Sequence, residues 1–236
     1  MLWYKGWLET RFRILLMLFY AVFPIPLFTL AVPAPNPAHP ASLAAVAGTV
    51  GFFGFYYSII PLMLAGSGIK TQADLHPRKG LHGSMYFTLS LPVSRFRLFA
   101  TRAGLGMLMV AGVLAIAPTA AWIIFPSLRM HITGSDLFAY WVTFSVCTSA
   151  FYFLGVLLST FLDDIWQNWT SMFGLVFLWW LLSRPFLPPS VNIFRAMGES
   201  SPLFTHTFPW ASMGISLGVA AILFLAALRV VQTREY

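Results

Sequence analysis

Residues 210–228 read WASMGISLGVAAILFLAAL, an apolar run without a single charged side chain. A helix that crosses the hydrocarbon core of a bilayer needs about 20 consecutive, mostly apolar residues. The run has this length and composition, and Arg229 follows it directly. The sequence therefore predicts a membrane-spanning helix at this position.

Five further stretches have the same apolar character. Together these runs take up more than half of the 236 residues, which leaves no room for a sizeable soluble domain. We therefore predict an all-α integral membrane protein in which residues 1–236 form a single domain with six transmembrane helices. The predicted spans are approximately Ile14–Val32, Ser42–Gly66, Gly104–Phe125, Leu137–Leu162, Thr170–Leu182 and Trp210–Leu228.

The composition supports a membrane protein and excludes several other classes. Hydrophobic residues make up 58% of the chain and charged residues only 9%, whereas roughly 25% of the residues in a soluble domain are charged. This excludes an ordinary soluble enzyme, a disordered chain and a nucleic-acid-binding module. The single cysteine, Cys147, excludes a disulfide framework within the chain.

The basic residues indicate how the chain is oriented in the membrane. Cytoplasmic segments of membrane proteins are enriched in Lys and Arg. Eleven of the fourteen basic residues lie in the N-terminal segment, in the loop between the second and third spans, and in the C-terminal segment. We therefore expect a multi-pass protein of a bacterial or archaeal plasma membrane with both termini in the cytoplasm. The net charge of +7 then reflects topology and not affinity for nucleic acid.

The first predicted span has an alternative interpretation as a cleavable signal peptide, because Lys5, Arg11 and Arg13 precede it. Its apolar run is long and is interrupted by Pro24 and Pro26. No good cleavage site follows these prolines, so a retained span is the favoured interpretation.

The fourth predicted span carries polar and aromatic residues on one helical face. Polar groups in the hydrocarbon core need hydrogen-bond partners or a water-filled cavity. The stripe therefore predicts either hydrogen bonding between helices or one wall of a permeation pathway. Its members are Trp141, Ser145, Thr148, Tyr152, Gly155 and Ser159.

Small residues recur at every third or fourth position in the second and sixth predicted spans. Small side chains let the backbones of membrane helices approach each other closely. The two stripes therefore predict packing inside the bundle or, alternatively, an interface between subunits. They consist of Ala47, Gly51, Gly54 and Ser58 in the second span and of Ala211, Gly214, Gly218 and Ala221 in the sixth.

No ionisable residue lies near the middle of a predicted span. Proton relays and ion-coupled carriers usually place such residues at mid-membrane. The pattern therefore argues against an ion-coupled transporter and against an intramembrane protease or metal enzyme. The sequence also lacks a G-x-x-x-x-G-K-[ST] phosphate-binding loop and a catalytic constellation. We predict that the chain is not an enzyme and holds no cofactor or metal of its own.

Two segments beside the spans are expected to lie in the membrane surface. Residues 1–13 are aromatic and basic at helical spacing, which predicts an interfacial helix. Residues 184–209 are apolar but interrupted by prolines, which predicts a re-entrant hairpin on the extracytoplasmic side. Inside this hairpin, Ser190 is placed to cap a short helix, Val191–Met197, that Gly198 ends.

The cytoplasmic loop of residues 67–103 contains the most specific motif in the chain, Leu89-Ser90-Leu91-Pro92-Val93-Ser94-Arg95. With the aromatic and basic N-terminal segment and the apolar hairpin before the last span, this motif resembles the six-span permease subunits of type-2 ABC exporters. The resemblance covers the layout of the whole chain, and the heptapeptide is its specific element. The sequence departs from the family pattern at Gln72 and Asp74, where many relatives carry a glutamate.

The resemblance implies a dimer of permease subunits, each resting on a separate ATP-binding cassette subunit that binds ATP and Mg. It implies that the N-terminal helix and the loop of residues 67–103 couple to this ATPase, and that the second and fifth spans line the dimer axis. ATP-driven closure of the ATPases would then switch the spans between two states and open an export path. The implied docking residues are Trp7, Glu9, Arg11, Gln72, Asp74, His76, Arg78, Lys79 and Arg95. The candidate pathway-lining residues are Tyr56, Tyr57, Ser145, Thr148, Tyr152, Trp179 and Trp180.

Two other functions stay open at the level of the sequence. The chain could be a membrane anchor that recruits a cytoplasmic partner without moving a solute. It could also be a membrane-embedded enzyme that acts on lipid through outside residues such as Arg195 or His206. For an exporter, apolar and aromatic walls fit amphiphiles, lipids, drugs or peptides equally well.

Overall fold

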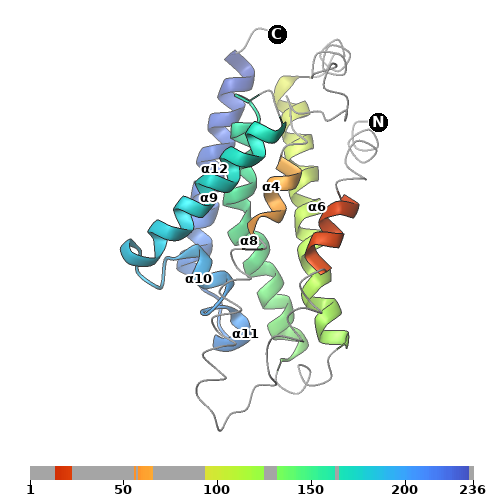
Figure 1. The fold of residues 1–236 in the computed structure, drawn as a ribbon, viewed down its shortest axis with the longest axis vertical. Helices are drawn as coiled ribbons and strands as arrows, with labels where there is room; N and C mark the ends of the chain where they lie inside the picture. Colours follow the sequence, from red (N-terminus) through yellow and green to blue (C-terminus); the bar gives the residue numbers. More distant parts are fainter. Residues whose placement is uncertain are drawn as a thin grey trace.

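The structure is a computed structural model that describes residues 14–22, 56, 58–65, 94–124, 132–162 and 165–233. Within these residues every regular element is a helix (Figure 1). Residues 14–22 form a helical segment. The other helices are α4 (Ile60–Ala65), α6 (Arg95–Ile124), α8 (Gly134–Leu158), α9 (Ile165–Phe186), α10 (Ile193–Met197), α11 (Pro202–Thr205) and α12 (Trp210–Thr233).

Three of the helices, α6, α8 and α12, are long and apolar enough to cross a membrane. They correspond to the third, fourth and sixth predicted spans and indicate a membrane protein. The fifth predicted span falls on α9, which has 22 residues but is not among these three. Most of the first and second predicted spans, and the predicted interfacial helix of residues 1–13, lie outside the described residues.

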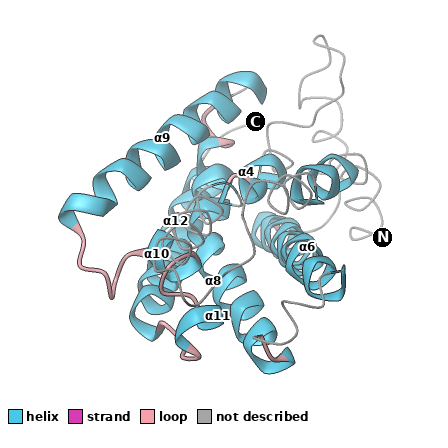
Figure 2. Cartoon of the chain, turned by 60° about the horizontal axis from the view of Figure 1, so that its bottom comes forward, coloured by secondary structure: helices cyan, strands magenta, loops and turns pink. Residues whose placement is uncertain are grey.

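The bundle is built around α8, which contacts each of the other labelled helices. Of its most apolar stretch, 56% is buried, against 29% for α6 and 28% for α12. Both views place α9 on the opposite side of α8 from α6 (Figures 1 and 2). Because α8 is enclosed by neighbours, it is the helix whose side chains hold the fold together.

Helix α6 begins earlier than the hydropathy of the sequence predicts. It starts at Arg95, whereas the predicted span starts at Gly104, so residues 95–103 of the predicted coupling loop are helical. The Ser94 hydroxyl accepts a hydrogen bond from the backbone N–H of Arg97 at 3.3 Å and so satisfies one donor of the first turn. With 30 residues, α6 is about 45 Å long and exceeds the roughly 30 Å hydrocarbon core. Its arginine-containing first turns can therefore lie outside that core.

A capping box starts α8. The Thr133 hydroxyl accepts from the backbone N–H of Asp136 at 3.3 Å, and the Asp136 carboxylate accepts from the backbone N–H of Thr133 at 3.2 Å. The two residues thereby satisfy two backbone donors that a helix start otherwise leaves unpaired.

The segment between α9 and α12 folds back onto the bundle. The short helix α10 buries Ile193, Phe194 and Met197, and the re-entrant position of this segment in the membrane stays a prediction. The predicted cap of this helix is wrong: Asn192, not Ser190, is the N-cap, because its side-chain oxygen accepts from the two backbone N–H groups that follow. Gly198 ends the helix, as predicted.

Candidate functional site

The polar and aromatic stripe of α8 packs against α6 at two levels. The indole Nε1 of Trp141 donates a hydrogen bond to the carbonyl oxygen of Ala111 at 2.8 Å. Further along, Tyr152 is only 3% exposed. Its hydroxyl lies over Gly106 of α6, where an added Cβ atom would overlap it. This face of α8 is therefore an interior surface of the chain.

Gly155, on the same stripe, marks the place where three helices meet. A Cβ atom at this position would overlap the side chain of Ala65 on α4 and would lie 2.9 Å from the Sδ and Cε atoms of Met172 on α9. All three residues are buried. The missing side chain lets the helices come this close, which is how small residues act in membrane bundles.

The hydroxyl groups of the stripe bond mostly within α8 itself. Thr148 Oγ1 donates to the carbonyl of Phe144 at 2.8 Å, and Ser159 Oγ donates to that of Val156 at 2.7 Å. Ser145 Oγ is buried and makes no hydrogen bond with any residue in the described ranges. The predicted hydrogen bonding between helices thus involves the indole of this stripe and not its hydroxyls. The pathway-lining role of this face stays a prediction.

Tyr56, a pathway candidate from the second predicted span, contacts the first helical segment. Its ring stacks on that of Tyr20 with centroids 4.1 Å apart, and its hydroxyl donates to the Tyr20 carbonyl at 2.9 Å. The neighbouring candidate Tyr57 lies outside the described residues.

The two candidate tryptophans of α9 have different surroundings. Trp179 packs edge-on against Phe151 of α8 with ring centroids 5.1 Å apart. Trp180 is half-buried, and the guanidinium carbon of Arg184 is 4.7 Å from its ring centroid. The first tryptophan therefore joins α9 to the bundle, and the second forms a cation–π pair at the end of the helix.

Only one of the predicted ATPase-docking residues lies in the described part of the chain. Arg95 is the first residue of α6 and the last residue of the heptapeptide motif. The others lie outside the described residues, and their roles stay predictions: Trp7, Glu9, Arg11, Gln72, Asp74, His76, Arg78 and Lys79.

The small residues of α12 divide between two faces. Ser216 lies on the buried face, and its hydroxyl donates to the carbonyls of Val146 and Cys147 on α8 at 3.0 and 2.8 Å. Gly214 and Gly218 are exposed, and a Cβ atom at either would meet no other atom within 4 Å. The serine therefore packs α12 inside the chain, whereas the predicted glycine stripe faces outward.

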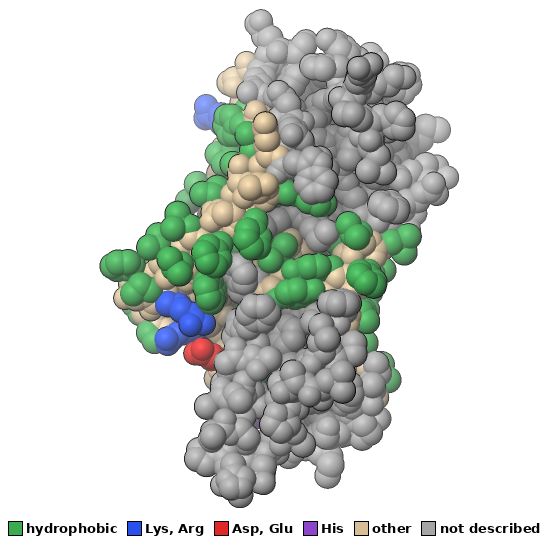
Figure 3. All heavy atoms as spheres, in the orientation of Figure 1, with side chains coloured by type: hydrophobic (Ala, Val, Ile, Leu, Met, Phe, Trp, Pro, Cys, Tyr) green, Lys and Arg blue, Asp and Glu red, His purple; other side chains and the backbone are tan. Residues whose placement is uncertain are grey.

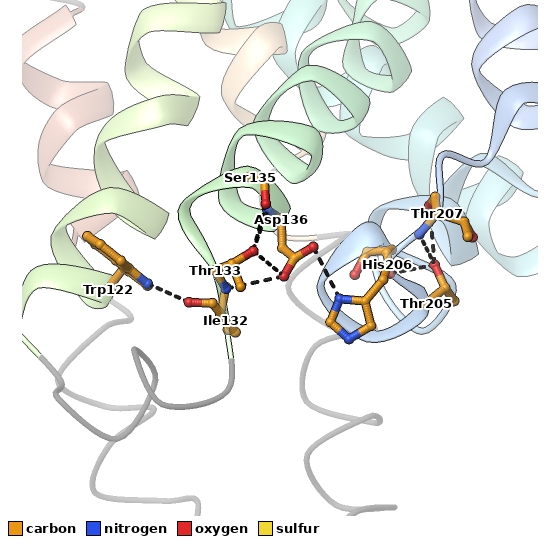
Figure 4. A network of polar contacts seen from close by, with 9 residues as sticks. Trp122, Ile132, Thr133, Ser135, Asp136, Thr205, His206 and Thr207 are labelled. Atoms are coloured by element: carbon orange, nitrogen blue, oxygen red, sulfur yellow. Dashed lines mark hydrogen bonds and ion pairs between the residues drawn. The ribbon is translucent and has the colours of Figure 1, made fainter.

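Asp136 centres a polar cluster at the start of α8 (Figure 4). One carboxylate oxygen accepts from the Thr133 hydroxyl at 2.6 Å, and the other lies 3.1 Å from Nδ1 of His206. His206 follows α11 in a left-handed backbone conformation, with a φ of 53°. This cluster joins the segment after α9 to the first turn of α8.

The His206–Asp136 pair has two members of a hydrolytic triad. Within the described ranges, no Ser, Thr or Cys side chain forms a hydrogen bond with the His206 imidazole. The same residues contain no group of three His, Cys, Asp or Glu side chains that could hold a metal ion. The contact that the structure shows for this pair links the segment after α11 to the start of α8.

A cavity of about 70 Å³ opens between the end of α9 and α10. Arg184, Arg195 and the carboxylate residue Glu199 line it together with the buried Asn192. Arg195 lies 3.9 Å from Glu199, one helical turn further on. Apolar side chains cover α9 next to these charged groups (Figure 3). The cavity therefore combines positive charge with an apolar border.

Two buried asparagines were not singled out from the sequence. Asn192 is 1% exposed and bonds to the carbonyl of Ser183 as well as capping α10. Asn168 of α9 is fully buried, and neither atom of its amide group has a hydrogen-bond partner among the residues that the structure describes. An amide within an apolar stretch is the signal that could have identified them, because buried polar groups usually need partners.

Comparisons with protein-family models, with curated proteins and with solved structures find no match to this chain.

Proposed function

We propose that the chain is the permease subunit of an ATP-driven ABC exporter and that two copies form the translocation path above separate ATP-binding subunits. The observation that carries this proposal is the heptapeptide Leu89–Arg95. Its last residue is the first residue of α6. A partner that binds the adjoining loop would therefore act directly on a helix long enough to cross the membrane.

The positions of the charged side chains support an external source of energy. In α6 the arginines lie within the first eight residues, in α8 the only charged residue is in the first turn, and in α12 the only one is Arg229 near the end. No Asp, Glu, His, Lys or Arg in these three helices lies at mid-span, where proton-coupled or ion-coupled carriers usually place one. Hydrolysis of ATP by a partner would supply the driving force.

The one-sided packing of α9 supports a second copy of the chain as a partner. Asn168, Met172 and Val176 are buried against the bundle. On the side of α9 that points away from these residues, Leu178 and Leu181 are 49% and 51% exposed. By the resemblance, the fifth span lines the dimer axis, and this outer face of α9 would contact the equivalent helix there. The extracytoplasmic segment would then lie on the far side of a plasma membrane.

Co-purification and transport assays test the proposal. The full chain, tagged and extracted from its own membrane, should retain a protein with a G-x-x-x-x-G-K-[ST] motif. Charge reversal of Asp74 or Arg78 should weaken that association, and an intact complex after replacement of residues 71–81 would contradict the docking assignment.

Reconstituted vesicles separate the permease from a membrane anchor and from a lipid-modifying enzyme. ATP-stimulated movement of a solute is expected for a permease. A complex that binds the ATPase without transport would indicate an anchor. Turnover of lipid by the purified chain without ATP would indicate an enzyme.

A further inference from the structure

The cavity at the end of α9 carries an unbalanced positive charge. Arg195 faces the carboxylate of Glu199 at 3.9 Å, so these two charges offset each other. Arg184 also lines the cavity, and its described contact is the ring of Trp180. Within the part of the chain that the structure describes, Arg184 has no carboxylate partner. The cavity is therefore suited to an anion.

An aromatic ladder leads along α9 to this cavity. The Phe173 and Phe177 rings are stacked with centroids 6.4 Å apart, and Phe177 lies 5.8 Å from Trp180. Positions 173, 177, 180 and 184 follow the four-three-four spacing that keeps residues on one helical face. Phe173 and Phe177 are 47% and 43% exposed. One flank of α9 is thus apolar along its length and positively charged at its end.

From this combination we propose that the cavity binds the phosphate headgroup of an anionic phospholipid and that an acyl chain of the lipid lies along the aromatic ladder. Arg184 would donate to the phosphate oxygens, since a guanidinium presents several N–H groups in a planar fork that suits phosphate. The ladder would contact the chain through Phe177. This proposal concerns binding and does not depend on the proposed transport function.

The dimensions and surroundings favour a lipid over a free anion. A cavity of about 70 Å³ is several times larger than the roughly 10–15 Å³ that a single water requires, so it admits a small polar group. An anion alone would leave the exposed phenylalanines without a role in binding. Tryptophan and arginine at the end of an apolar helix are also the residues expected at the level of lipid headgroups.

Native mass spectrometry of the purified full chain tests the proposal. Phosphatidylglycerol and phosphatidylcholine with identical acyl chains are offered at equal concentration. The wild-type chain should retain the anionic lipid preferentially. The variant R184Q should lose this preference by about tenfold, the loss expected when one charge-assisted hydrogen bond is removed. The matched control R229Q removes an arginine at the end of α12 and should leave the preference unchanged.

Two further arms separate the parts of the proposal. F177A should weaken the retention of both lipids and keep the preference between them, because it alters the acyl-chain contact. Millimolar inorganic phosphate should not displace phosphatidylglycerol from the wild-type chain. Equal retention of the two lipids by the wild type, unchanged preference in R184Q, or displacement by free phosphate would each overturn the proposal. The first and third results need no variant, so a misfolded variant cannot hide the outcome.

Discussion

Nδ1 of His206 lies 3.1 Å from Oδ1 of Asp136, which joins the segment between α9 and α12 to the first turn of α8. The two residues are 70 positions apart in the sequence, and their side chains point toward each other beside the start of α8 (Figure 4). The same carboxylate also takes part in the capping box of α8. A single side chain therefore starts one helix and holds another segment in place.

Because Asp136 both caps α8 and contacts His206, we predict that substituting Asp136 destabilises the chain more than substituting His206. We expect D136A to lower the apparent melting temperature of the detergent-solubilised chain more than H206A does, because D136A removes the cap of α8 together with the contact to His206. Thermal unfolding followed by circular dichroism measures both variants. E199A, at a carboxylate that is more exposed than Asp136, serves as the control. A larger effect of H206A than of D136A would show that the cap contributes little.

We predict that alanine substitutions at two glycines of α6, Gly106 and Gly104, change the stability of the fold in opposite directions. G106A places a methyl group against the Tyr152 hydroxyl and should destabilise the fold by about 1–3 kcal/mol, the usual cost of overpacking. G104A meets no atom within 4 Å and should stabilise α6 by up to about 1 kcal/mol, because alanine favours a helix. Thermal unfolding of the two variants gives the comparison.

The double variant G106A/Y152F tests the cause of the effect at Gly106. Removing the hydroxyl takes away the nearest atom and leaves the ring carbon Cζ at 2.8 Å, so part of the lost stability should return. The interaction between the two substitutions is obtained from a double-mutant cycle. Strictly additive effects would mean that the hydroxyl is not the source of the strain.

The two buried asparagines predict opposite outcomes for one substitution. N168L should be neutral or stabilising, because the Asn168 amide has no hydrogen-bond partner to lose within the described part of the chain. N192L should cost about 1–2 kcal/mol, because it removes the cap of α10. Equal losses in thermal unfolding would contradict the assignment of hydrogen bonds. If N168L keeps its stability but abolishes ATP-driven transport, the amide serves the transport cycle instead of the fold.

The sequence predicted the long apolar helices α6, α8 and α12 but not the position at which α6 begins. Helix α12 begins at Trp210 as predicted, because hydropathy reports the part of a helix that lies in hydrocarbon. Helix α6 extends back to Arg95 because its charged first turns need no apolar side chains outside that layer. Hydropathy therefore recognises a span and misses the helical turns that continue beyond it.

The candidate site was predictable in its residue types but not in its contacts. The spacing of Tyr152 and Gly155 identified a face of α8, yet which helices cover that face depends on residues far apart in the sequence. The spacing likewise placed Gly214 and Gly218 on one face of α12. It did not show that Ser216, on another face, makes the contact with α8. The pairing of Arg184 with Trp180, one turn apart on α9, is local and could have been read from the spacing.

The proposed dimer predicts cross-linking at one exposed face and not at another. Cys147 is the only cysteine and is fully buried, so an introduced surface cysteine should be the reactive one. Under mild oxidation in the membrane, L178C on α9 should form a symmetric disulfide-linked dimer, because the equivalent helices meet at the two-fold axis. Ile222 on α12 is more exposed than Leu178, with 68% of its side chain accessible against 49%. The variant I222C should nevertheless stay monomeric on a non-reducing gel. Dimers of I222C without dimers of L178C would place the subunit interface on the exposed glycine face of α12, where small residues permit close approach.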